Sequence, residues 1–274
     1  MPFLGDGNMS RYSYIVIDPL SSFGPGDRLQ GVLSLLRDCG YSGVELNLTE
    51  PTGVDLDSLA GWLSDLGLVV PSFLTGDAYS QGLCLSAPDL SVRQRTVQRL
   101  IDYLDVARQL DAILVVGLLQ GFRSDEPDPD VANRRIAECL REVAAAAEDK
   151  KCEIVIEPVN HLQVGFNNSV GEVLALIEAV GSGAVRPMVD TIHMNIEETS
   201  LVEPIRKCGD RLRHVHLCES NGSLFGTGNV DFGSVLKSLD EIGYRRFASV
   251  KVYRGATLEE AAPASIEYLR KIEG

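Results

Sequence analysis

The chain has 274 residues, of which 45% are hydrophobic, and 25 basic against 39 acidic residues give it a net charge of −14. This length suits one α/β barrel with a large buried core. The acidic balance argues against nucleic acid as a partner, because binding phosphate requires a basic surface. We interpret it as a solvated surface that aids solubility.

Nothing in the sequence predicts a membrane partner or secretion. No run of 18 or more apolar residues occurs, so no transmembrane helix is expected. Residues 1–11 have neither the basic start nor the apolar segment of a secretory signal. Six cysteines without a CxxC pair are ordinary for a reducing compartment. We therefore predict a cytoplasmic protein.

Short β-rich runs alternate with amphipathic helical segments, a pattern typical of repeated βα units around a parallel sheet. Some of these runs, such as 113–116, are apolar throughout, which indicates strands buried on both faces. Eight strands are predicted, at Tyr14–Ile17, Gly43–Leu48, Val69–Leu74, Ile113–Leu118, Glu153–Glu157, Arg186–Asp190, His214–Leu217 and Ala248–Val252.

A helical stretch is expected after each strand. The clearest are Val92–Leu110, Val131–Asp149, Val170–Val180, Phe232–Ile242 and Leu258–Ile272, and Gly40, Gly67, Gly181 and Gly243 stand where C-terminal cap glycines belong. An open doubly wound sheet usually has fewer strands and often a glycine-rich turn after the first, which Asp18-Pro19-Leu20 does not provide. We therefore predict one domain over residues 1–274, a (β/α)8 TIM barrel.

All four histidines of the chain lie at or just after the fifth, sixth and seventh predicted strands. In this fold the carboxyl ends of the strands form the active-site face. The alternation in His214-Val215-His216 directs both imidazoles to the inside of the barrel. His214 is expected to be a polar core residue beneath the site.

Two carboxylates end apolar strands beside these histidines. Glu157 follows Ile154-Val155-Ile156, and Asp190 follows Met188-Val189, with His193 on the next loop. An unpaired carboxylate there would be costly, so each needs a cation or a hydrogen-bond network. Two carboxylates and one imidazole suit Mn²⁺, Co²⁺ or Mg²⁺. Such an ion can polarise a substrate carbonyl and hydroxyl and stabilise an enediolate after proton abstraction.

Four motifs make the chain resemble the sugar phosphate isomerase/epimerase family with a xylose-isomerase-like barrel. Within it, the ketose 3-epimerases of the tagatose/psicose type and the 5-keto-gluconate epimerases look most similar. The motifs are Gly82-Leu83-Cys84-Leu85-Ser86, Ile156-Glu157-Pro158-Val159-Asn160, the stretch Asp190-Thr191-Ile192-His193-Met194-Asn195-Ile196-Glu197-Glu198, and Gly226-Thr227-Gly228-Asn229-Val230-Asp231-Phe232.

The resemblance implies one divalent ion held by a Glu, an Asp, a His and a second Glu on strands five to eight, with the two glutamates as the acid–base pair. By motif, Glu157, Asp190 and His216 match the first three ligands, and His193 matches a substrate-contacting histidine. It also implies a carbohydrate substrate and a homo-oligomer, a dimer or a tetramer.

The chain departs from the family at the fourth ligand, where the last strand places Lys251. The other candidate substrate-binding positions also differ: His161 replaces an arginine, Gln163 replaces a glutamate, and Asn221 is followed by Gly222 in place of an arginine.

Three forms of Lys251 are open. A neutral amine would act as a second base, a cation would replace the metal between Glu157 and Asp190, and a free amine would form a Schiff base with a keto substrate.

These patterns favour an isomerase or epimerase of a keto sugar or keto sugar acid, with metal-assisted proton transfer next to the carbonyl and with Glu157 and Lys251 as catalytic residues. One alternative is a lyase or dehydratase that uses Lys251. Another is a sugar-binding barrel that has lost its activity and its metal. A DNA-repair endonuclease of the same barrel family fits less well, because it needs many histidines for a multi-zinc cluster and a surface that tolerates DNA.

Overall fold

The computed structural model describes residues 11–23, 27–52 and 55–273, and the prediction about a secretory signal falls mostly on residues outside these ranges. Eight parallel strands pair in chain order and close into a barrel. Tyr12 of the first strand pairs with Ala248 of the last, which completes the ring. The predicted TIM barrel is confirmed. The strands are β1 Arg11–Pro19, β2 Gly43–Asn47, β3 Ser72–Leu74, β4 Ile113–Val116, β5 Ile154–Ile156, β6 Val185–Asp190, β7 His214–Cys218 and β8 Phe247–Lys251.

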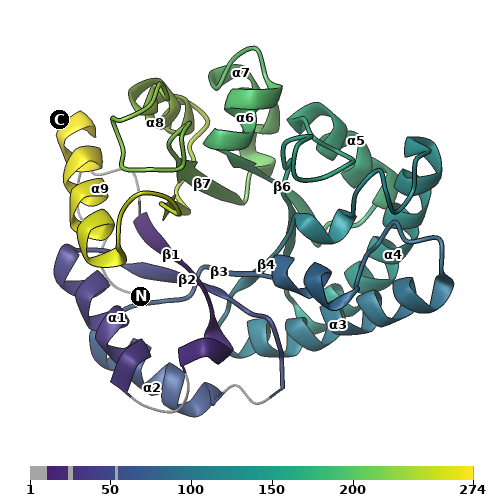
Figure 1. Ribbon diagram of the computed structural model, residues 1–274, viewed down its shortest axis with the longest axis horizontal. Helices are drawn as coiled ribbons and strands as arrows, with labels where there is room; N and C mark the ends of the chain where they lie inside the picture. The colour runs from purple at the N-terminus through teal and green to yellow at the C-terminus, as the bar shows by residue number, and fades with distance from the viewer. Residues whose placement is uncertain (1–10, 24–26, 53–54, 274) are drawn as a thin grey trace.

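Helices surround the strands, as Figure 1 shows. They are α1 Asp27–Cys39, α2 Leu56–Leu66, α3 Leu90–Gln109, α4 Pro129–Lys150, α5 Val170–Val180, α6 Thr191–Glu197, α7 Val202–Cys208, α8 Phe232–Glu241 and α9 Leu258–Glu273, with short 3₁₀ turns at Leu20–Phe23, Gly76–Gln81, Leu118–Gln120 and Gly209–Arg211. Among the described residues, no helix combines the length and the apolar character that crossing a bilayer requires.

The helix ends follow from local chemistry. Ser169 and Glu172 form a reciprocal capping box at the start of α5, which satisfies backbone N–H groups of its first turn. Gly67 and Gly181 end α2 and α5 in the left-handed conformation, which glycine adopts without steric cost. The predicted cap glycines at positions 40 and 243 also have positive φ.

Four strands, β2 to β5, are shorter than predicted, and β3 and β4 show the reason. β3 begins at Ser72 because Pro71 lacks a backbone N–H, and Val69 forms only an isolated bridge with Gly43. β4 ends at Val116, and Gly117 starts a turn into the 3₁₀ helix Leu118–Gln120. The early end of β4 shapes the site, because a Cβ atom at Gly117 would lie 2.5 Å from Oε2 of Glu157.

Side-chain alternation divides the barrel interior into an apolar and a polar part. The main core packs between the outer faces of the strands and the helices. A separate small apolar cluster is formed by Ile113, Val115, Val155 and Met188 of β4, β5 and β6. Polar side chains are buried on the other strands, namely Ser13, Glu45, Ser72, His214, His216 and Ser249. The polar part lies below the predicted site and contacts it.

Candidate active site

The predicted site residues come together at the carboxyl ends of β5 to β8. Glu157 follows β5, Asp190 is the last residue of β6, His216 lies within β7 and Lys251 ends β8. Asp190 pairs in register with His216, and Lys251 lies two residues beyond Ser249, the register partner of His216. His193 reaches the same place from α6, whose N-cap is Asp190.

Asp190 Oδ2 is the centre of the cluster. It accepts a hydrogen bond from the Lys251 ammonium. It also lies 3.4 Å from Nδ1 of His216 and 3.7 Å from Nε2 of His193. Oε1 of Glu157 faces the same two nitrogens, at 3.2 Å and 3.7 Å. Two buried carboxylates therefore face two imidazoles and one lysine.

The cationic neighbours determine the ionisation of both carboxyls. Burial by itself raises the pKa of Glu157, but the hydrogen bond from His216 and the charge of Lys251 outweigh it and lower that pKa. The pKa of Asp190 falls well below its usual value, because the charge of Lys251 and the hydrogen bond from His216 outweigh the same effect of burial. Both groups are carboxylates at neutral pH.

Lys251 is held in its charged form by these carboxylates. Burial lowers the pKa of its amine, but the charges of Asp190 and Glu157 raise it by more. The pKa of Lys251 therefore lies above its usual value. Lys251 forms an ion pair with Asp190, so of the three forms considered for this residue it adopts the cation.

The second nitrogen of His193 has a defined partner. Asn160 Oδ1 accepts the backbone N–H of Leu162 at 3.1 Å, so its amide nitrogen faces Nδ1 of His193, at 2.7 Å, and donates to it. The proton of the neutral ring then sits on Nε2, which faces the carboxylates. Burial is the largest cause of the lowered pKa of His193, in keeping with a neutral ring. An N–H in this place suits a hydrogen bond to a substrate oxygen better than a metal bond.

His216 differs from His193 in its surroundings. Burial lowers its pKa, but Glu45, Asp190 and Glu157 raise it well above the usual value. Its Nδ1 points at Glu157 and Asp190, and its Nε2 lies 3.1 Å from Oε1 of Glu45. Without a metal, both nitrogens of this ring donate to carboxylates.

The donor set fits a divalent cation. Glu157, Asp190 and His193 offer ligand atoms within 4.8 Å of one another, and Nδ1 of His216 lies at hydrogen-bond distance from Glu157. Carboxylate oxygens and one imidazole are the ligands that Mn²⁺, Co²⁺ and Mg²⁺ accept. These carboxylate and histidine groups could therefore bind a metal, which would share Asp190 with Lys251.

A cavity of about 200 Å³ opens beside the cluster. The cluster residues in its wall are Glu157, His193, His216 and Lys251, and Asn47, Thr75, Asp77 and Gln163 add polar groups. Among the predicted substrate-binding residues, Gln163 and His193 thus face this cavity.

The structure does not bring His161 or Asn221 to the cavity wall. His161 is exposed, and its Nδ1 lies 2.5 Å from Oε1 of Glu197. The Asn221 amide donates to the backbone oxygen of Thr227 within the loop after β7. Substrate contacts by these two residues stay predictions.

A side chain at the position after Asn221 would be strained and would meet Tyr253 in this structure. Gly222 has φ +72°, and a Cβ atom there would lie 2.4 Å from the Tyr253 ring. The backbone N–H groups of Tyr253 and Arg254 also donate to the Gly222 carbonyl oxygen. Tyr253 therefore fills the space that a side chain at position 222 would enter.

Sequence reasoning missed Glu45, which lies on β2 and is completely buried against both histidines of β7. The signal was present, because one glutamate interrupts the apolar residues of Gly43-Val44-Glu45-Leu46. Its partners could not be inferred, because they lie 169 and 171 residues further along the chain.

The closed parallel barrel and the acid–base groups at its carboxyl edge define a TIM-barrel enzyme site. The chain belongs to the Xylose isomerase-like TIM barrel family, whose model matches residues 33–272.

The relatives agree with this assignment. The chain is 31% identical over 239 residues to an L-ribulose 3-epimerase of Mesorhizobium japonicum, covering 85% of this chain and 78% of the relative. It is 30% identical over 212 residues to a ketose 3-epimerase of Arthrobacter globiformis, covering 76% and 72%. A solved L-ribulose 3-epimerase superposes with a TM-score of 0.84 at 25% identity, covering 97% of this chain and 95% of that one.

Proposed function

We propose that the protein is a ketose 3-epimerase, which inverts the carbon next to the carbonyl of a keto sugar. The observation that carries the proposal is the pair formed by Glu157 and Lys251, a carboxylate and an ammonium that line one cavity. One can accept a proton and the other can donate one. The similarity to an L-ribulose 3-epimerase and a ketose 3-epimerase supports the substrate class.

In this mechanism Glu157 removes the proton from the carbon next to the carbonyl. The electron pair moves to the carbonyl oxygen and gives an enediolate. Lys251, on β8 and separated from Glu157 by β6 and β7, returns a proton to the opposite face of the same carbon. Glu157 is left protonated and Lys251 neutral, and proton exchange with solvent restores both. His193 donates its Nε2–H to a substrate oxygen and orients the sugar.

Glu157, Asp190 and His216 would hold the divalent cation, Mn²⁺, Co²⁺ or Mg²⁺. When bound there, the ion supplies a Lewis acid that polarises the carbonyl and stabilises negative charge on oxygen. Lys251 and the ion share Asp190, so we infer that the wild-type protein binds the ion more weakly than a variant without the lysine.

A lyase acting through a Schiff base is not favoured. Forming the Schiff base requires a neutral amine, and Asp190 and Glu157 raise the pKa of Lys251. The similarity to an L-ribulose 3-epimerase and a ketose 3-epimerase also supports proton exchange over bond cleavage.

The test is incubation with ketoses in D₂O, with and without Mn²⁺. L-Ribulose, D-psicose, D-tagatose and D-fructose form the panel. The expected result is inversion at C3 with one deuterium incorporated there, detected by NMR and mass spectrometry. A Glu157→Gln variant should lose both exchange and inversion.

Lys251→Met separates the two proton steps. It should keep deuterium exchange at C3 and lose inversion, because only Glu157 then reaches the carbon. Inversion at the wild-type rate in this variant would remove Lys251 from the mechanism. Absence of exchange with every ketose of the panel, in metal-loaded protein, would contradict the proposed function.

A homo-oligomer, dimer or tetramer, and a cytoplasmic location belong to the same proposal. Light scattering coupled to size-exclusion chromatography measures the assembly directly.

A further inference from the structure

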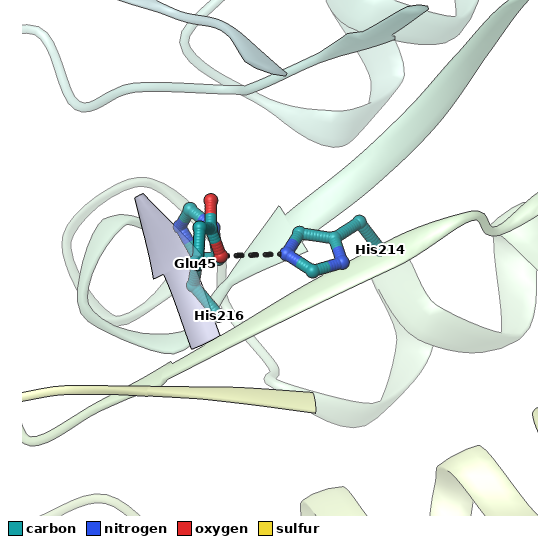
Figure 2. A group of neighbouring side chains, drawn as sticks. All are labelled: Glu45, His214 and His216. Carbon is teal, nitrogen blue, oxygen red and sulfur yellow. Dashed lines mark hydrogen bonds and ion pairs between the residues drawn. The ribbon is translucent and has the colours of Figure 1, made fainter. Parts of the chain in front are cut away.

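A polar layer lies inside the barrel directly below the site. Glu45 of β2 is its centre and is completely buried. Its Oε2 lies 2.9 Å from Nε2 of His214, and its Oε1 lies 3.1 Å from Nε2 of His216. Figure 2 shows the contact between Glu45 and His214, with His216 overlapping Glu45 in this view. Both oxygens of one glutamate are thus used by two histidines of the same strand.

Serine hydroxyls hold this arrangement from the other side. Nε2 of His214 lies 3.0 Å from Oγ of Ser72 and 3.2 Å from Oγ of Ser249. Ser249 in turn lies 2.6 Å from Oγ of Ser13. Because β1, β2, β3, β7 and β8 all contribute, the position of Glu45 is determined by the closed barrel.

Glu45 determines which nitrogen of His216 faces the site. A carboxylate accepts hydrogen bonds, so Nε2 of His216 must carry a proton when it faces Glu45. Nδ1 is then the nitrogen that points to Glu157 and Asp190. A ring held at both nitrogens cannot turn over without losing both contacts.

We propose that Glu45 is a positioning residue of this active site: through His216 it fixes the imidazole nitrogen that faces Glu157 and Asp190. Its effect on turnover rests on the proposed epimerase function, whereas its effect on the His216 ring does not. Removing such a partner of a metal-binding or acid–base imidazole typically costs about 10–100-fold in metal affinity or activity.

Glu45, His214 and His216 also have the composition of a separate metal site. The hydrogen bonds favour the positioning role, because Nε2 of His214 already contacts two serine hydroxyls besides Glu45. All three side chains are at most 1% exposed.

The test compares Glu45→Leu, which removes both acceptors, with Glu45→Gln, which keeps one. Ser265→Ala, which removes a buried hydroxyl on α9 outside this layer, is the control. Long-range ¹H–¹⁵N NMR of metal-free protein reports the protonated nitrogen of each ring, and four histidines can be assigned by substituting them one at a time. The kcat and KM for the best ketose of the panel and the Mn²⁺ affinity are measured on the same samples.

Glu45→Leu should lose the hydrogen-bonded Nε2–H signal of His216 and lower kcat by about 10–100-fold with little change in KM. Glu45→Gln should retain the signal and most of kcat, because its carbonyl oxygen can still accept from His216 while its amide group turns to His214. Ser265→Ala should match the wild type in both. If Glu45→Leu does not fold, Glu45→Ser, whose hydroxyl is too short to reach the rings, takes its place.

A Glu45→Leu protein with an unchanged His216 signal and kcat within twofold of wild type would overturn the proposal. A second equivalent of Mn²⁺ or Zn²⁺ that needs Glu45 and His214 but not Glu157 would also overturn it, in favour of a metal site. If the wild type turns over no ketose, the proposed function fails, and the NMR comparison still decides the role of Glu45.

Discussion

Replacing Lys251 tests whether its ammonium group competes with a metal ion for Asp190. The lysine side chain is 15% exposed and donates to Asp190, which is a candidate metal ligand. Lys251→Gln removes the charge and adds no anionic ligand, and Lys251→Glu also introduces a carboxylate, the group that the resemblance to the family implies at this position.

The magnitude follows from Coulomb's law. Two unit charges ~4 Å apart interact by ~4 kcal/mol at an effective dielectric constant of ~20, and a dication doubles this to ~8 kcal/mol. If about one third of that repulsion, ~2.7 kcal/mol, survives solvent screening, the dissociation constant changes by about 100-fold. Lys251→Gln should therefore bind Mn²⁺ about 100-fold more tightly than wild type, and Lys251→Glu more tightly again.

Isothermal titration with Mn²⁺ at constant pH and salt measures the three dissociation constants. Lys237→Gln, an exposed lysine on α8, is the control for a change of net charge alone and should match wild type. A Lys251→Gln protein that binds Mn²⁺ within threefold of wild type would refute the reasoning, because the ammonium would then not compete for Asp190.

Three further predictions concern the same cluster. Gly117→Ala should lower kcat/KM by about 100-fold, since the new methyl group would lie 2.5 Å from Oε2 of Glu157 and must displace it; steady-state kinetics measures this, and a loss below threefold would contradict it. The pKa of Asp190 is lowered on folding, so its stabilising contribution is present above the unfolded pKa of about 4 and is lost as the pH falls toward the folded value. Urea titrations between pH 2 and 5 should show a steeper fall of the unfolding free energy for wild type than for Asp190→Asn, and parallel curves would exclude this contribution. Borohydride treatment with a ketose should leave Lys251 unmodified in peptide mass spectra, because its raised pKa disfavours the neutral amine; a reduced adduct would revive the lyase alternative.

The position of the site could be predicted from local pattern. An inward-facing residue recurs at every second position of a strand, so His214 and His216 had to share one face. Glu157 and Asp190 come at the ends of apolar strands, and the carboxyl ends of parallel strands meet at one edge of a barrel. With eight such strands in one chain, the sequence alone indicates that these residues cluster at one edge of the barrel.

The ends of elements were less predictable. Apolar residues continue past the last strand pairing, as at Leu118 after β4, and only the turn at Gly117 decides where the strand stops. Gln163 faces the cavity whereas the nearby His161 does not, because His161 is held by Glu197 of α6.

Composition and periodicity thus determined the barrel, its active-site edge and the carboxylate–imidazole chemistry, because these depend on residues close together in the chain. Barrel closure decided the rest. It brought Glu45 against His216, which orients the ring, and placed Lys251 on Asp190, which keeps the lysine charged. Ionisation and tautomer depend on distances of a few ångströms between strands that are far apart in sequence, and only the folded barrel sets those distances.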